Sequence, residues 1–119
     1  MFDAYPYLAT GSSMMKFGKR GKPHFRIVQL SPDSSYLLWF SANKYMDQSR
    51  IPVNSINAVV MGQQTDNFKR MKWSSLSPCS FSILHGPAGN QKSLDLVAKS
   101  SDEALLWVHA LRKLVDMRK

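Results

Sequence analysis

The sequence is poor in cysteine, with Cys79 as the single thiol among 119 residues. One thiol excludes a disulfide scaffold and a zinc site built from several thiolates, and it is compatible with a reducing cytosol. No run approaches the ~18 consecutive apolar residues that span a bilayer, and no signal peptide or lipid-attachment motif is visible. We therefore expect a cytoplasmic protein with no cofactor and no metal site.

Acidic residues are also scarce, with eight Asp and Glu against sixteen Lys and Arg, for a net charge of +8. Such a charge implies an anionic partner, which could be nucleic acid, an acidic protein or a membrane surface. The apolar fraction of 44% is enough for a core, and the length fits one domain. We expect an N-terminal extension over residues 1–10 and a single domain over residues 11–119.

The positive charge is concentrated in one short segment, residues 16–26, and no acid lies between Asp3 and Asp33. Its five basic residues are Lys16, Lys19, Arg20, Lys22 and Arg26. A single-signed cluster interrupted by glycines and a proline favours a binding surface over an ordinary solvated face.

A second, smaller basic cluster follows later in the chain. Its members, which we treat as candidate membrane contacts together with the neighbouring aromatic residue, are Lys69, Arg70, Lys72 and Trp73. A tryptophan in a loop can sit at the level of lipid headgroups, but packing beneath the loop is an equally good interpretation of Trp73.

Alternating apolar and polar residues predict about seven short strands. The expected strands are 13–17, 24–30, 36–41, 50–53, 56–61, 79–85 and 92–97. Residues 18–23 form a turn, so the first two strands make a hairpin with a basic tip. Segment 36–41 is apolar enough to be buried on both faces, Pro52 favours an edge position, and residues 63–78 form a polar connection.

The chain ends in a predicted amphipathic helix at about residues 101–116. Ser100 and Glu103 fit a capping box, and apolar residues including Trp107 recur at helical spacing. We expect Trp107 to plug the open end of the barrel. The predicted fold is therefore mainly β: a seven-stranded antiparallel barrel or sandwich capped by one C-terminal α-helix.

This order of elements resembles a pleckstrin-homology (PH) domain. The wording closest to the PH domains of phosphoinositide-specific phospholipases C is Met14-Met15-Lys16, Leu38-Trp39, Met61-Gly62-Gln63-Gln64-Thr65, Ser93-Leu94-Asp95-Leu96-Val97 and Trp107. Residues 16–23, with Phe25 and Trp39-Phe40-Ser41, are similar to the PH domain of plant proteins that combine a FYVE finger with chromatin-condensation-regulator repeats.

The resemblance implies that the open end beside the first hairpin holds a phosphoinositide headgroup. The residues at matching positions are Lys16, Lys22, Lys44 and Ser93, and the charge cluster adds Lys19, Arg20, His24 and Arg26 as candidate headgroup ligands. The family's strongest binders carry a further basic residue where this chain has Gly18, and an arginine where it has His24. A neutral imidazole lacks the five donors of a guanidinium.

The expected function is a lipid-binding module that recruits its protein to membranes by peripheral association with cytoplasmic leaflets. The expected ligands are phosphoinositides or phosphatidic acid, and the expected state is a monomer. The alternative is a protein-interaction module of the same fold without a specific lipid ligand. Nucleic acid is not expected, because the aromatic residues fall mostly in core register. Nor is catalysis, since no catalytic motif is present.

Overall fold

The structure is a computed structural model that describes residues 4–19, 21–44, 48–71 and 73–118. The strands are β1 (Ser12–Phe17), β2 (His24–Leu30), β3 (Tyr36–Phe40), β4 (Ser49–Pro52), β5 (Ile56–Met61), β6 (Ser80–His85) and β7 (Lys92–Val97). The helical segments are α1 (Tyr5–Thr10), η2 (Val53–Ser55), α2 (Asp66–Met71), η3 (Ser74–Cys79) and α3 (Ser101–Met117).

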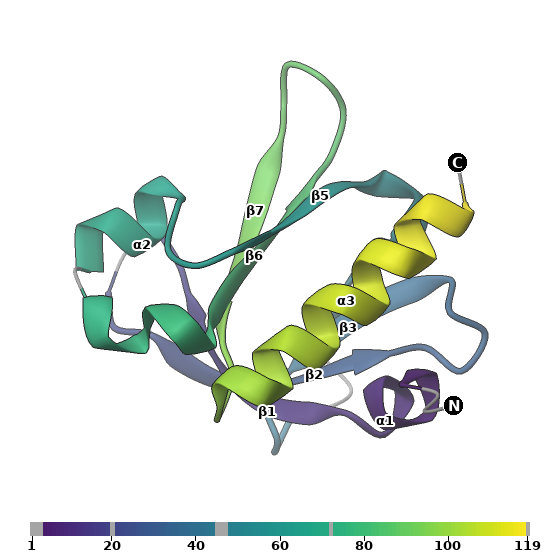
Figure 1. The fold of residues 1–119 in the computed structure, drawn as a ribbon, viewed down its shortest axis with the longest axis horizontal. Coiled ribbons are helices and arrows are strands. Elements are labelled where there is room, and N and C mark those ends of the chain that lie inside the picture. The colour runs from purple at the N-terminus through teal and green to yellow at the C-terminus, as the bar shows by residue number, and fades with distance from the viewer. Residues whose placement is uncertain (1–3, 20, 45–47, 72, 119) are drawn as a thin grey trace.

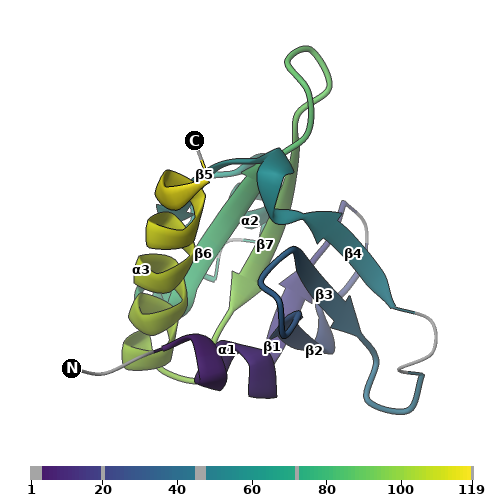
Figure 2. The same ribbon diagram turned by 90° about the vertical axis from the view of Figure 1, so that its right-hand side faces the viewer.

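The seven strands form one antiparallel sheet in the order β4-β3-β2-β1-β7-β6-β5. The sheet is strongly bent, and α3 lies across its concave side (Figure 1). Figure 2 shows the strands β1–β4 turned away from β5–β7, with α3 beside the second group. The predicted seven-stranded fold is confirmed, and Pro52 lies on the edge strand β4 as expected.

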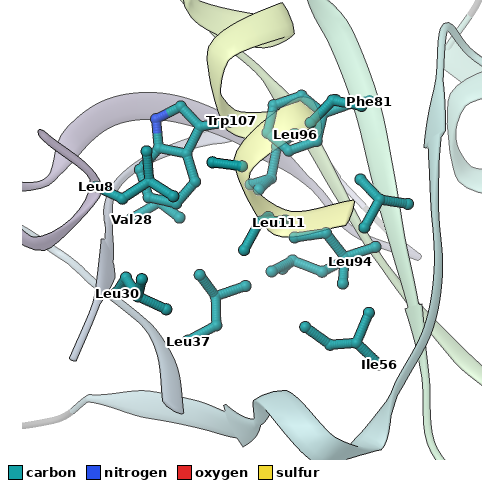
Figure 3. Close-up of a cluster of buried hydrophobic side chains, with 14 of the residues drawn as sticks. Leu8, Val28, Leu30, Leu37, Ile56, Phe81, Leu94, Leu96, Trp107 and Leu111 are labelled. Atoms are coloured by element: carbon teal, nitrogen blue, oxygen red, sulfur yellow. The ribbon is translucent and has the colours of Figure 1, made fainter. Parts of the chain in front are cut away.

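The core fills the space between the sheet and α3 (Figure 3). Trp107 is fully buried there, and its indole Nε1 donates a hydrogen bond of 3.0 Å to Ser12 Oγ in β1. Leu8 of α1 is also fully buried, so the segment before β1 contributes to this core. Val28 and Leu30 show that the even-numbered side chains of β2 point inward, toward the core.

The C-terminal helix begins where its capping box predicts. Ser100 Oγ accepts a hydrogen bond of 3.1 Å from the backbone N–H of Glu103, which satisfies one donor of the first turn. Among the described residues, no helix has the length and apolar character needed to cross a bilayer.

Two expectations for local structure are wrong. In β3 only Leu37 is buried, because Trp39 and Phe40 lie half-exposed on the wall of a pocket. The connection 63–78 is not a plain loop but contains α2 and η3. These two segments cover the outer face of β1, where Phe68 packs on Phe17 with ring centroids 5.1 Å apart.

Candidate functional site

An open pocket of about 260 Å³ lies at the end of the sheet where β1, β2, β3 and β4 meet. Three cationic side chains line it, from three different segments: Lys16 at the end of β1, Arg26 near the start of β2, and Lys44 after β3. The rest of the lining is Trp39, Phe40, Ser41 and Ser49. None of these seven residues is acidic, so the pocket is a concentrated positive site with partly apolar walls.

The inward register of β1 and β2 explains why two of these cations converge. Lys16 follows the buried Met14 on the same face, and Arg26 precedes the buried Val28. One guanidinium donor of Arg26 is taken by the backbone oxygen of Phe25 at 2.8 Å. The remaining donors have no partner in the part of the chain that the structure describes, so they are available to an anion.

His24 does not line this pocket. It is exposed, and in the antiparallel register it is paired with Lys16. The family resemblance implies a guanidinium at position 24, and in this chain the arginine that lines the pocket is Arg26, two residues later. The pocket therefore has an arginine even though position 24 does not.

The turn between β1 and β2 holds the next cations. Lys19 and Lys22 are exposed, while Arg20 lies outside the described residues. Gly21 adopts a positive φ of 77°, which glycine tolerates and other residues rarely adopt. Both described lysines extend the positive surface beyond the rim of the pocket.

Ser93 has a different environment from the other predicted headgroup ligands. Its hydroxyl donates a hydrogen bond of 2.9 Å to Asp95, which is fully buried in β7. The same carboxylate also accepts hydrogen bonds from Thr65, Asn67 and Ser82, at 2.6 to 2.8 Å. Ser93 is thus part of a structural network, and it is not among the residues that line the pocket.

The second basic cluster lies on α2 and the segment after it. Lys69 and Arg70 occupy the last turn of α2 and are exposed, and Lys72 lies outside the described residues. Trp73 is 41% exposed, with its ring edge-on to Phe17 at a centroid distance of 5.6 Å. Trp73 therefore both packs on the protein and presents part of its ring to solvent.

No histidine or cysteine joins a metal site: across the described ranges there is no group of three His, Cys, Asp or Glu side chains that could hold an ion. His85 is the last residue of β6, at the start of the β6–β7 connection. Burial lowers the pKa of His85, and the positive charge of Lys92 lowers it further. We assign it no role in binding.

Sequence reasoning missed the aromatic wall of the pocket, the Asp95 network and the exposure of Phe25, which is 70% exposed. For Phe25 a signal was present. Phe25 is at an odd-numbered position of β2, whereas the apolar residues Val28 and Leu30 are at even-numbered positions, so Phe25 lies on the opposite face of the strand. For Asp95 the sequence shows only a single carboxylate inside an apolar strand.

A family model described as "Pleckstrin homology domain" matches residues 4–116. The human "Inactive phospholipase C-like protein 1" is 31% identical over 119 residues, which cover 98% of this chain and 11% of that protein. The mouse "1-phosphatidylinositol 4,5-bisphosphate phosphodiesterase eta-2" is 39% identical over 106 residues, which cover 88% of this chain and 7% of that protein. The chain thus spans only a small part of these relatives.

Solved structures agree on the fold. "Crystal Structure of L. pealei PLC21" superimposes with a TM-score of 0.75 at 16% identity, covering 91% of this chain and 15% of that one. At this identity the likeness shows the arrangement of strands and helix.

Proposed function

Because this chain belongs to the pleckstrin homology domain family, we propose that it is a lipid-binding module that holds an anionic phospholipid headgroup between Lys16, Arg26 and Lys44. The ligand class is phosphoinositide or phosphatidic acid. The resemblance to the PH domains of phospholipases C is confirmed by the relatives, and the resemblance to the plant proteins stays a prediction.

The observation that carries this proposal is the convergence of three cations on a pocket whose described lining contains no acid. Arg26 offers a planar fork of donors that matches a phosphate, whereas the two lysines are point charges on flexible stems. The half-exposed rings of Trp39 and Phe40 reduce the water around the bound group, which strengthens each charge interaction. This combination suits a phosphate-bearing headgroup.

The expected affinity is modest. Each Lys or Arg close to an anionic leaflet contributes about 1 kcal/mol, and salt screens that contribution. We propose a binding module and not an enzyme. It acts as a monomer without nucleic acid and associates peripherally with cytoplasmic leaflets, and its attachment is transient unless a second anchor supports it.

The alternative, a protein-interaction module, has less support in the geometry. A peptide that adds a strand to β5 needs the free backbone groups of that edge. Arg112 Nε of α3 donates a hydrogen bond of 2.9 Å to the backbone oxygen of Val59 in β5, so one acceptor along this edge is already occupied.

Vesicle flotation tests the lipid proposal directly. Vesicles of phosphatidylcholine carry phosphatidylinositol 4,5-bisphosphate, phosphatidic acid or phosphatidylserine at equal total charge, at low and high salt. The first lipid is included because the mouse relative's name gives it as that enzyme's substrate. Lys16→Ala combined with Lys44→Ala should weaken binding about 30-fold, since two charges near the leaflet are lost. The thermal midpoint should stay nearly unchanged.

The matched control is Lys92→Ala with Lys113→Ala, which removes the same charge from exposed positions that do not line the pocket. This control should bind nearly as well as the parent chain. Equal losses in both double variants would mean that net charge alone attracts the domain, without a headgroup pocket. No binding to any vesicle at low salt would overturn the proposal and favour a protein partner.

A further inference from the structure

Phe25 is the most exposed of the large apolar side chains in the described residues, at 70%. It lies on β2, two residues after Pro23 of the basic turn, and it is paired across the hairpin with Met15. Odd-numbered side chains of β2 point away from the core, so Phe25 projects from the outer face of the hairpin. A phenylalanine in this position contributes little to folding.

Phe25 is not an isolated apolar residue, because it forms one wall of a groove of about 240 Å³. The other apolar lining residues come from β1, η3, β7 and the residue after β7: Met14, Met15, Leu76, Cys79, Val97 and Ala98. Trp73, which is 41% exposed, packs on Phe17 of the same outer face. The outer side of the hairpin therefore presents two exposed aromatic rings beside an open apolar groove.

Cations surround this apolar surface. Lys19 and Lys22 lie in the turn, Lys69 and Arg70 lie on α2, and Lys99 borders the groove. Figure 1 shows α2 and the β1–β2 turn at the same end of the molecule. None of the residues that line the groove is acidic, although α2 begins with the exposed Asp66.

We propose that this outer face of the hairpin, with Phe25 and Trp73, is a second membrane contact that inserts aromatic rings into the headgroup boundary of an anionic bilayer. The inference rests on the proposed lipid-binding function and adds an apolar contact to it. The inner face of the same hairpin carries Lys16 and Arg26 of the headgroup pocket, so the two contacts are back to back.

A bilayer fits this arrangement because one partner must meet both faces at the tip of the hairpin. It offers phosphates and an apolar boundary within a few ångströms of each other, and it closes around an inserted tip. Aromatic side chains favour that boundary, and cations beside them favour an anionic surface. A rigid protein partner would need separate complementary surfaces on opposite sides of the hairpin.

Salt separates the two contacts, because screening weakens the contribution of the cations and leaves the burial of aromatic surface largely intact. We expect the parent chain to keep a measurable part of its binding to phosphatidylcholine–phosphatidylserine vesicles at 0.5 M NaCl. Phe25→Ala should lower the partition coefficient about tenfold at both 0.1 M and 0.5 M NaCl. Met117→Ala, which truncates an exposed apolar side chain (67%) on α3, is the matched control and should bind like the parent.

A second measurement reports on insertion itself. Phosphatidylcholine brominated in its acyl chains should quench part of the tryptophan fluorescence of the bound parent chain. Trp39 on the headgroup pocket can also contribute, so the test is that Trp73→Phe is quenched clearly less than the parent chain and Trp39→Phe is not. The ring in Trp73→Phe keeps its packing on Phe17, so this variant should fold normally.

The outcomes distinguish this inference from the proposed function. If Phe25→Ala binds like the parent at both salt concentrations while Lys16→Ala with Lys44→Ala binds weakly, the headgroup pocket stands and the aromatic contact is wrong. The absence of quenching in the bound parent chain would also overturn the aromatic contact. If no variant and no parent chain binds vesicles, both proposals fail and the groove fits an apolar peptide instead.

Discussion

At the scale of single residues, the proposed affinity for a headgroup depends on which positions around the pocket carry a cation. Lys16 and Arg26 point into the pocket because they share the inward register of β1 and β2. Gly18, two residues after Lys16, follows the same alternation but has no side chain. The resemblance to strongly binding PH domains puts a basic residue at this position, so we propose that Gly18 limits the affinity of this site.

Gly18→Lys should therefore tighten binding. The φ of Gly18 lies outside the left-handed region, and an added Cβ would meet nothing within 4 Å, so the substitution should not disturb the fold. One further cation near the leaflet predicts about fivefold tighter binding to vesicles that contain phosphoinositide. Gln91→Lys adds the same charge in the exposed β6–β7 connection and should change binding much less. Equal gains in the two variants would contradict a pocket at the hairpin.

The roles of residues were predictable where they depended on charge, and less predictable where they depended on the direction in which a side chain points. The run from Lys16 to Arg26 identified the hairpin from composition alone. His24 and Arg26 lie on the same face of β2, so the choice between them depends on how far along the strand the pocket lies, which only the folded sheet shows. The hydrogen bond of Ser93 to the buried carboxylate of Asp95 has no signal in the sequence.

At the scale of elements, the strands and the terminal helix were predictable and the α2–η3 segment was not. The alternation of apolar and polar residues and the capping box are local patterns, and the structure has the strand and the helix start that they predict. Among the described residues of segment 63–78 only Phe68 is buried, so no apolar period marks the short helix. What holds α2 in place is a long-range contact: Thr65 and Asn67, at its start, donate hydrogen bonds to Asp95 of β7.

Asp95→Asn tests this attachment. The amide keeps the shape of the carboxylate but replaces one acceptor oxygen with a donor. That donor then faces either the Thr65 and Ser82 hydroxyls or the Asn67 amide and the Ser93 hydroxyl in a buried site. We expect the free energy of unfolding to fall by about 2–3 kcal/mol, as measured by urea denaturation. Ser93→Ala removes only one of the four donor groups and should cost about 1 kcal/mol. A loss in Asp95→Asn no larger than in Ser93→Ala would show that the network does not anchor α2.

At the scale of the whole molecule, the net charge of +8 becomes meaningful only once it is placed. The bent sheet brings Lys16, Arg26 and Lys44 together from segments that are up to 28 residues apart in the sequence. The fold class and the charged hairpin were predictable, because both follow from periodicity and composition. Lys16, Arg26 and Lys44 were among the predicted headgroup ligands and do line the pocket, but its aromatic wall was not predictable, because Trp39 and Phe40 were expected to be buried.

The central claim is that one end of the sheet binds a phosphate-bearing headgroup, and an NMR titration tests it most directly. The ¹⁵N-labelled chain is titrated with a soluble inositol phosphate and, separately, with short-chain phosphatidic acid. The account predicts that the largest amide shifts with at least one ligand lie in residues 16–26 and around Lys44, while α3 and the β6–β7 hairpin stay unchanged. Shifts confined to α3 and the β5 edge, or no shift with either ligand at millimolar concentration, would contradict it.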